Sequence, residues 1–281
     1  MSGINFIDII YSLIIIYVII SIFVFFAVNS NIFLNRRFAK YDLKLNAELR
    51  FLEPDHIAYW VAKNGDSTKN AIVLHGFTRN SSVVEGRAMI YWNLGYNVYL
   101  VDNASHGQSK SILFPSGFQY SWVVKEIIHK ENISDPVIHG VSMGAIAAAY
   151  IAQKYPKIPK FIVCEALPNN FDNLYNELLQ YMKVPTFLFF WVDWLSRKTV
   201  WRMFRDKDAD YILTDIKCPM FYIHGKNDQM FKYEDHYNKT IQELNGKDNF
   251  ESWLVPNSRH SAMNENPDFE SRVIDFIKKY E

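Results

Sequence analysis

The sequence has little cysteine, no net charge, and no repeated or low-complexity segment. Two cysteines in 281 residues are too few for a disulfide framework or a cysteine-rich zinc module. Thirty basic residues balance 30 acidic ones, so the chain lacks the positive excess that is typical of nucleic-acid-binding proteins. Hydrophobic residues make up 49% and charged residues 21%, which excludes a disordered or collagen-like chain. We therefore expect a globular protein with no nucleic-acid partner.

Charge is also missing from a long segment near the N-terminus. No charged residue lies between Ile9 and Val28, where Ile, Val and Phe dominate. Twenty helical residues span roughly 30 Å, the thickness of a bilayer core. Nothing before Asp8 is basic, and the apolar stretch is longer than that of a signal peptide. We interpret residues 1–30 as an uncleaved transmembrane anchor and residues 31–47 as a juxtamembrane linker. A cleaved signal peptide and a buried core helix are the alternatives.

Basic residues follow the apolar segment, and none precedes it. The positive-inside rule therefore places the C-terminal side in the cytoplasm. The two cysteines agree with a reducing compartment. We expect a single-pass protein of the cell membrane whose main domain faces the cytoplasm. The basic residues are Arg36, Arg37, Lys40 and Lys44.

Beyond the linker, short apolar runs alternate with helical patterns. Residues 48–63 predict an antiparallel hairpin that leads into a sheet. Helical patterns lie near 83–94, 119–130, 144–154, 233–244 and 267–280. This alternation predicts a mostly parallel, doubly wound α/β domain over residues 48–281. The strands expected to be buried on both faces are 71–74, 98–101, 137–138, 161–164, 220–223 and 253–255.

Residues 169–210 interrupt this rhythm because they are too many for a simple crossover between two strands. We expect two or three helices inserted above the sheet as a cap. At least some of its aromatic side chains are expected to cover an apolar substrate pocket, and the alternative is that they pack the cap onto the domain. These aromatics are Phe187, Phe189, Phe190, Trp191, Trp194, Trp201 and Phe204.

The clearest chemical signal is the pentapeptide from Gly140 to Gly144, which has the pattern G-x-S-x-G. It directly follows a predicted strand and opens an alanine-rich helix, the context in which this pattern marks a nucleophilic serine. The two glycines leave room for a sharp strand-to-helix turn, and Ser142 would project above the sheet. The adjacent helix N-terminus favours developing negative charge. A structural serine in a tight turn is the alternative.

A serine nucleophile needs a base, and the base needs an orienting acid. On this architecture the chain order is serine, acid, histidine. Asp228 follows one predicted strand and His260 follows the last one, so both lie at strand C-terminal ends, where open α/β sheets place their sites. We therefore expect Ser142, Asp228 and His260 to form a catalytic triad.

Other titratable residues fit these roles less well. Glu165 follows the strand after the nucleophile and is the reserve acid. Asp215 precedes its strand, on the wrong edge of the sheet. His236 lies within a helical pattern and is expected at the surface. The histidines are scattered, and Cys164 and Cys218 lack metal-binding spacing, so we expect neither a metal nor another cofactor.

The tetrahedral intermediate of acyl transfer also needs hydrogen-bond donors for its oxyanion. The backbone N–H of Met143, directly after the nucleophile, should be one donor. The second should come from the loop after the first parallel strand, and we predict the N–H of Phe77. Gly76 would let the backbone approach the substrate oxygen, and His75 is expected to be structural.

Together these residues resemble the α/β-hydrolase superfamily of serine hydrolases over about residues 48–281. The resemblance is nearest to the bacterial branch similar to monoacylglycerol lipases and serine aminopeptidases, some members of which carry an N-terminal membrane helix. It implies the same nucleophile, acid and base as the residue-level argument. The segment 102–109 is similar to the D-x-R-x-H-G-x-S loop of the family, but Ala104 stands where arginine is usual. Val141 replaces a frequent histidine, and Ala145 replaces a frequent second glycine.

The leading hypothesis is a membrane-anchored serine hydrolase that cleaves carboxylic esters through an acyl-enzyme. The anchor and the aromatic insertion favour an acyl lipid or another apolar ester as substrate. A peptidase, an amidase or an acyltransferase would use the same triad and remains an alternative. A catalytically silent binding module is a further alternative, because such folds also host proteins that are not enzymes.

Overall fold

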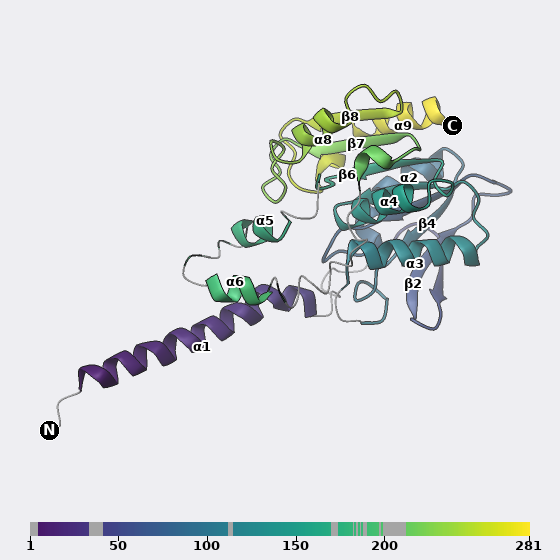
Figure 1. Cartoon of the computed structure of the whole chain (residues 1–281). Helices are drawn as coiled ribbons and strands as arrows, with labels where there is room; N and C mark the ends of the chain where they lie inside the picture. The colour runs from purple at the N-terminus through teal and green to yellow at the C-terminus, as the bar shows by residue number, and fades with distance from the viewer. Residues whose placement is uncertain are drawn as a thin grey trace.

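The computed structural model describes residues 5–33, 42–111, 115–169, 174–181, 183, 185, 187, 190–196, 198 and 212–281. Its body is a single eight-stranded sheet with helices on both faces, and a long N-terminal helix projects away from it (Figure 1).

The sheet has the strand order β1-β2-β4-β3-β5-β6-β7-β8. β1 and β2 form the predicted hairpin and pair antiparallel, β2 is antiparallel to β4, and the remaining neighbours are parallel. Each predicted strand is found. The last differs from expectation because it is half-exposed, since it closes the edge of the sheet and has one neighbour. The strands are β1 Glu48–Leu52, β2 Ile57–Ala62, β3 Asn70–Leu74, β4 Asn97–Val101, β5 Val137–Val141, β6 Phe161–Glu165, β7 Met220–Gly225 and β8 Phe250–Val255.

The helices follow the predicted pattern with two local differences. The pattern at 83–94 opens with a 3-10 turn over Ser81–Val84 before α2 begins, and the pattern at 233–244 becomes α8 after a series of turns. The helices are α1 Phe6–Phe33, α2 Glu85–Asn93, α3 Gly117–Lys130, α4 Met143–Lys154, α5 Leu174–Tyr181, α6 Phe190–Ser196, α8 Tyr237–Glu243 and α9 Phe269–Tyr280.

Two apolar layers hold these helices on the sheet. One layer contains side chains of α3 and α4 together with Ile72 and Leu74 of β3. The other contains side chains of α2 and α9 together with Ala71 and Val73 of the same strand. Successive residues of a strand point to opposite faces, so a continuous apolar run serves both layers. The predicted doubly wound α/β architecture is therefore confirmed.

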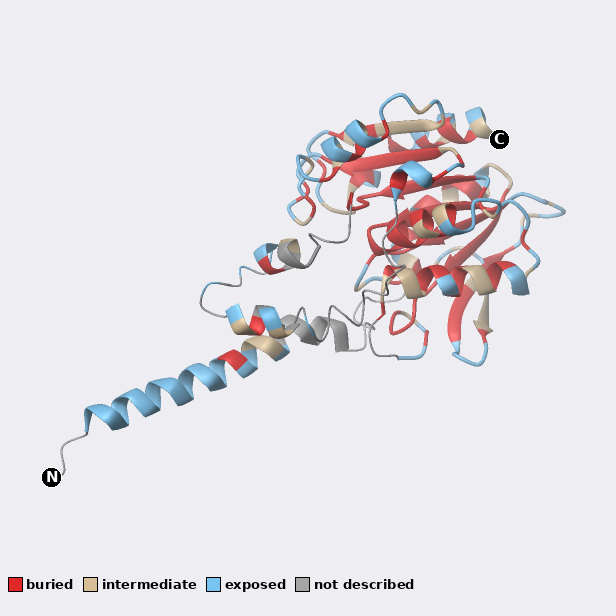
Figure 2. Cartoon of the chain, in the orientation of Figure 1, coloured by how far each residue is buried: buried red, intermediate tan, exposed pale blue. Residues whose placement is uncertain are grey.

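Helix α1 differs from every other helix in its surroundings. Its segment Phe6–Phe26 is long and apolar enough to cross a membrane, and only 6% of its most hydrophobic window is buried (Figure 2). That exposure distinguishes it from the core helix of a soluble domain. By length and composition it is a candidate membrane span or a signal sequence.

The segment that leads into β1 lies on the domain surface. Leu43, Leu45 and Ala47 pack against the layer that contains α2. The backbone N–H groups of Lys44 and Leu45 both donate to the Glu85 carboxylate at the start of α2, the first at 2.7 Å. Residues 42–47, expected to be linker, therefore follow the surface of the domain.

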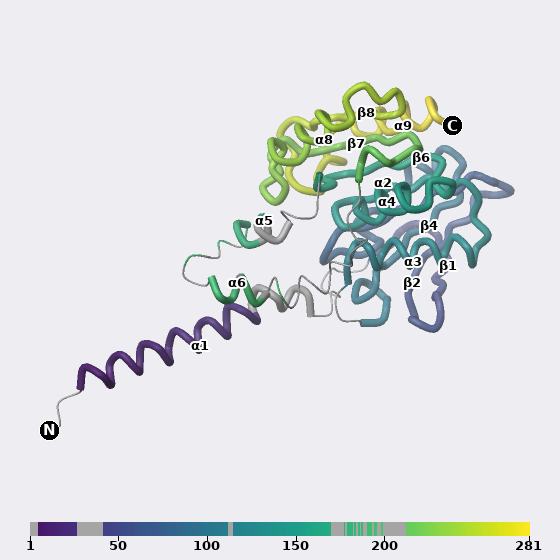
Figure 3. Tube along the Cα trace, viewed as in Figure 1, coloured from purple at the N-terminus to yellow at the C-terminus, as the bar shows by residue number. Residues whose placement is uncertain are grey.

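Helices α5 and α6 belong to the insertion between β6 and β7, and they lie on the side of the domain from which α1 projects (Figure 3). Phe187, Phe190 and Trp194 have highly exposed side chains. Phe189, Trp201 and Phe204 lie outside the described residues. The expected cover over a substrate pocket stays a prediction.

Candidate active site

Ser142 lies at the sharp turn between β5 and α4. Its φ of 53° and ψ of −111° are strained values for a residue with a side chain. The two glycines of the motif permit this turn by close approach. A Cβ on Gly140 would overlap the carbonyl of Gly144, and a Cβ on Gly144 would overlap the backbone of Leu74. The two glycines are therefore needed for the close packing of this turn, as the sequence pattern predicted.

The structure brings Ser142, His260 and Asp228 into one hydrogen-bonded chain. Nε2 of His260 lies 3.0 Å from Oγ of Ser142, and Nδ1 lies 2.7 Å from Oδ2 of Asp228. The three side chains come from the loops after β5, β8 and β7, which end at the same edge of the sheet. Residues 118 positions apart are thus within hydrogen-bond distance.

The hydrogen-bond partners fix the direction of proton donation along this chain. A carboxylate can only accept, so Nδ1–H of His260 donates to Asp228. In the neutral imidazole Nε2 is then the acceptor, and the hydroxyl of Ser142 donates to it. This is the arrangement in which a histidine can remove the proton of a serine that attacks an acyl group.

Asp228 is held as an anion. Burial by itself raises the pKa of this carboxyl. The hydrogen bond from His260, the electrostatic interactions with His260 and His224, and the N–H of Phe231 together outweigh that effect, so the net pKa is lowered. Its second oxygen, Oδ1, accepts the backbone N–H groups of Met230 and Phe231 at 2.8 and 2.9 Å. These amides hold the carboxylate in place and leave Oδ2 for the imidazole.

The two predicted oxyanion donors lie in the segments that flank Ser142. Met143 is the first residue of α4, so its N–H belongs to the first turn, whose amides have no carbonyl partner within the helix. Phe77 lies in the turn after β3, beside the serine. A side-chain carbon on Gly76 would stand 3.4 Å from Cβ of Ser142. Both segments therefore lie close to Ser142, and their role as oxyanion donors stays a prediction.

Two buried histidines form hydrogen bonds with the backbone around the turn after β3. Nε2 of His75 accepts the N–H of Asn103 at 3.1 Å, and Nε2 of His106 accepts the N–H of Thr78 at 3.2 Å. Burial lowers the pKa of His75, which favours the neutral imidazole. Both contacts bridge the turn after β3 to the loop after β4.

The loop after β4 is held without the arginine that is usual in similar sequences. Oδ1 of Asp102 accepts the N–H and the hydroxyl of Ser81 at 2.8 and 2.7 Å, and Oδ2 accepts the N–H of Gln108 at 3.0 Å. The backbone and a serine hydroxyl therefore bind the Asp102 carboxylate. Ala104, which is part of this loop, is fully buried in the hydrophobic core.

Glu165, the reserve acid, lies in a different network. Its carboxylate binds the guanidinium of Arg87 through both oxygens, with Nη2 to Oε2 at 2.7 Å, and accepts Nε2–H of His139 at 2.7 Å. Tyr91 donates to Nδ1 of His139 at 3.1 Å. All four side chains are buried. Burial raises the pKa of Glu165, but Arg87 and His139 lower it to about 2.

This network touches the catalytic segments through the backbone. Nη2 of Arg87 donates to the carbonyl of Ser261, the residue after His260, at 3.2 Å. The N–H of Ser142 donates to the carbonyl of Glu165 at 2.8 Å. Arg87 therefore supports the histidine loop directly, and the backbone of Glu165 supports the serine turn. Sequence reasoning did not identify Arg87, because an arginine on an amphipathic helix usually faces solvent.

The prediction for His236 was wrong, since this residue is 1% exposed. Its Nδ1 accepts the N–H of Asn169 at 3.0 Å, and its Nε2 donates to the Glu177 carboxylate at 2.7 Å. Asn169 lies at the start of the insertion and Glu177 lies on α5. His236 thus fastens the insertion to the domain, which a helical pattern could not indicate.

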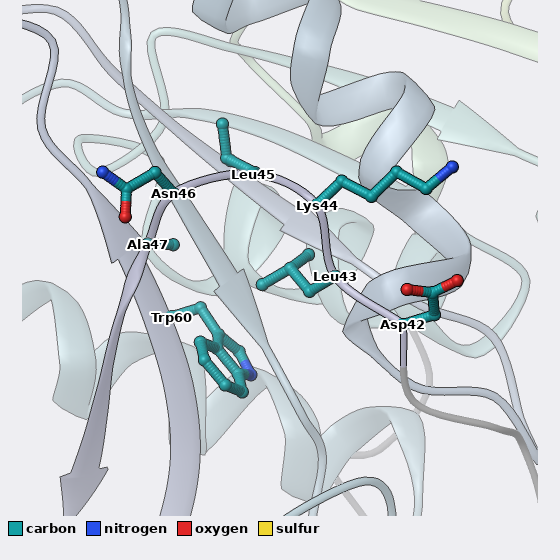
Figure 4. A pocket seen from close by; sticks show the side chains of 7 residues that line it. All are labelled: Asp42, Leu43, Lys44, Leu45, Asn46, Ala47 and Trp60. Atoms are coloured by element: carbon teal, nitrogen blue, oxygen red, sulfur yellow. The ribbon is translucent and has the colours of Figure 1, made fainter.

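The described residues contain no group of three or more His, Cys, Asp or Glu side chains that could hold a metal ion. A shallow surface depression is formed by the segment 42–47 and Trp60 (Figure 4). It belongs to the segment before β1, and its lining is separate from the serine turn. The hydrogen-bonded chain at Ser142 is therefore the candidate active site.

A family model described as the alpha/beta hydrolase fold matches residues 72–200. No curated protein matches the chain in sequence. Among solved structures, the esterase Pf2001 of Pyrococcus furiosus superposes with a TM-score of 0.66 at 23% identity. That match covers 86% of this chain and 98% of the esterase.

Two further structures are similar over most of their length. A monoacylglycerol lipase of Paleococcus ferrophilus has a TM-score of 0.57 at 16% identity and covers 79% of this chain and 99% of its own. Alpha/beta hydrolase domain-containing protein 10 from mouse has a TM-score of 0.61 at 17% identity and covers 84% and 100%. At such identities the likeness concerns the fold, and it confirms the predicted fold class.

Proposed function

We propose that this chain, which has the α/β-hydrolase fold, is a membrane-anchored serine hydrolase that cleaves carboxylic esters, namely acyl lipids or other apolar esters. The observation that carries the proposal is the hydrogen-bonded chain from Asp228 through His260 to Ser142 at a strained strand-to-helix turn. Glu165, the other candidate acid, already accepts hydrogen bonds from Arg87 and His139.

The geometry supports an acyl-enzyme reaction. As Oγ of Ser142 bonds to the ester carbonyl carbon, its proton passes to Nε2 of His260, and the charge of Asp228 stabilises the imidazolium. The carbonyl oxygen becomes an oxyanion that accepts the N–H groups of Met143 and Phe77. Collapse breaks the bond to the alkoxy group, which leaves with the proton of His260 as an alcohol. Water then attacks the acyl carbon and gives its proton to Nε2 of His260. The bond between the acyl carbon and Oγ breaks, Ser142 takes that proton back, and the carboxylic acid leaves.

The substrate class follows from the surroundings of the site. Helix α1 has the length and hydropathy of a membrane span, and we propose that it anchors the enzyme with the domain on the cytoplasmic side, because basic residues follow the span. An anchored enzyme meets lipids at high local concentration. Two solved structures with this fold are an esterase and a monoacylglycerol lipase by description.

The test is hydrolysis of p-nitrophenyl esters from acetate to palmitate by the full chain in detergent micelles, beside Ser142→Ala. We expect turnover that peaks at medium or long acyl chains and falls to near background in the variant. Labelling by a fluorophosphonate should likewise depend on Ser142. Equal turnover by both proteins would refute the assigned nucleophile, and labelling without ester turnover would favour a peptidase or amidase.

A further inference from the structure

We propose that helix α6, together with Phe187 before it, enters the lipid leaflet that surrounds the C-terminal half of α1, so that the bilayer itself is the partner of this surface. The α6 surface consists of the side chains of Phe187, Phe190 and Trp194. The inference rests on the proposed function, because it takes α1 to span a membrane.

The first observation is that α6 packs directly on α1. Nε1–H of Trp191 donates to the hydroxyl of Tyr17 at 3.1 Å. Ser21 of α1 is fully buried and Val192 of α6 is 2% exposed, although most of α1 is exposed. Tyr17 and Ser21 are four residues apart and share one face of their helix. Figures 1 and 3 show α6 lying along this part of α1.

The second observation concerns depth. The uncharged apolar segment of the sequence ends at Val28, seven residues after Ser21 and eleven after Tyr17. At about 1.5 Å per residue, these positions lie about 11 and 17 Å below that end. Interfacial helices lie about 5–10 Å into the boundary between headgroups and acyl chains. A helix that packs on Ser21 therefore lies within the leaflet whenever α1 spans it.

The third observation is the chemistry of the α6 surface. Its three aromatic side chains are 78%, 69% and 59% exposed in the order of the sequence. Large exposed aromatic side chains beside an apolar helix are unfavourable in water, whereas tryptophan is enriched at membrane interfaces.

The contact between the two helices also suits lipid. Helices pack in membranes through small residues and through hydrogen bonds between polar side chains. Ser21 provides the small residue, and the pair of Trp191 and Tyr17 provides the hydrogen bond.

This position has a consequence for substrate access. The insertion that carries α6 joins β6, which ends at Glu165 beside the serine turn, to β7, which leads to Asp228. With α6 in the leaflet, a described part of this insertion would lie in the bilayer. We therefore expect an acyl lipid to reach Ser142 from the leaflet.

Site-directed fluorescence on the full chain in vesicles of phosphatidylcholine and phosphatidylglycerol tests the proposal. An environment-sensitive nitrobenzoxadiazole probe would be attached to Phe190→Cys, to Trp122→Cys on α3 of the domain, and to Ile16→Cys in α1. Trp122 is 46% exposed and Ile16 is 52% exposed. The native Cys164 and Cys218 are buried and should remain unlabelled.

We expect nitroxide on the lipid acyl chains to quench the probes at Phe190→Cys and Ile16→Cys at least threefold more than the probe at Trp122→Cys. Aqueous iodide should show the opposite order. If only the α1 probe is lipid-quenched, the anchor holds and the α6 proposal fails. If neither is lipid-quenched, the anchor itself fails. A Phe190→Cys probe shielded from both quenchers would indicate a protein partner and would overturn the proposal.

A functional measurement follows from the same reasoning. Phe190→Glu with Trp194→Glu should lower turnover of a long-chain ester embedded in vesicles at least fivefold and leave turnover of soluble p-nitrophenyl acetate within twofold. The control is Trp122→Glu, which should change neither. Equal loss on both substrates would mean that the charges disturb the fold, and unchanged turnover in vesicles would overturn the route of access.

Discussion

Replacing Glu165 by glutamine would leave the guanidinium of Arg87 buried opposite a neutral amide. The side chain of Arg87 is 3% exposed and that of Glu165 is 0% exposed, so water cannot compensate for the lost charge. Removing one partner of a buried ion pair costs about 3–5 kcal/mol. The pKa of Glu165 gives a similar magnitude, because its lowering from 4.5 to about 2 corresponds to about 3 kcal/mol.

The assay is thermal unfolding of the full chain in detergent, followed by circular dichroism. For a domain of this size, each kcal/mol shifts Tm by about 2–4 °C, so Glu165→Gln should lower Tm by about 6–20 °C. A double variant with Arg87→Met carries no unpaired charge, and it should recover more than half of the loss. If the Tm losses of the two single variants simply add in the double variant, Arg87 and Glu165 are not coupled and the reasoning fails.

The effect should depend on pH in a definite direction. The folded-state pKa of Glu165 is depressed, so its ionisation stabilises the fold at pH values above the unfolded pKa, and this stabilisation is lost as pH falls through the folded pKa. The difference between wild type and Glu165→Gln should therefore be full above about pH 5 and shrink between about pH 4.5 and 2. A Tm change below about 1 °C at neutral pH would refute the reasoning.

Two further variants test the site. Asp228→Asn should lower kcat about 10³–10⁴-fold with little change in Tm, because the amide no longer selects the imidazole tautomer that accepts from Ser142, and ester hydrolysis measures this. Below its melting temperature, Glu165→Gln should keep kcat within a few fold, and a loss equal to that of Asp228→Asn would reverse the assignment of the acid. Gly140→Ala should destabilise the domain by about 1–3 kcal/mol in urea unfolding, since its Cβ overlaps the carbonyl of Gly144, and an unchanged midpoint would contradict the packing argument.

Much of the fold is encoded in local patterns. The strands of the parallel sheet are short apolar runs because both faces are covered, and the pattern around Ser142 specifies its own turn through two glycines. The positions of Asp228 and His260 follow from a topological rule, since the C-terminal ends of parallel strands meet at one edge. The sequence therefore predicted that these three side chains would meet. Their catalytic roles remain a proposal.

The buried contacts that support the site could not be predicted in the same way. Arg87 and Glu165 are 78 residues apart. From the sequence alone, Arg87 would be interpreted as a solvent-facing arginine and Glu165 as a candidate catalytic acid. His236 is buried because Glu177 and Asn169 of the insertion reach it, which depends on how the insertion folds back. Such pairs can be identified only from the three-dimensional structure, because the sequence around one partner does not indicate the other.

Helix α2 connects two parts of the molecule that local patterns treat as separate. Residues two apart on a helix point in different directions. Glu85 accordingly reaches outward to the amides of Lys44 and Leu45, in the segment that follows α1, while Arg87 reaches inward to Glu165 and to the carbonyl of Ser261. The same turn of helix therefore holds the chain that arrives from the apolar helix and the loop that carries His260.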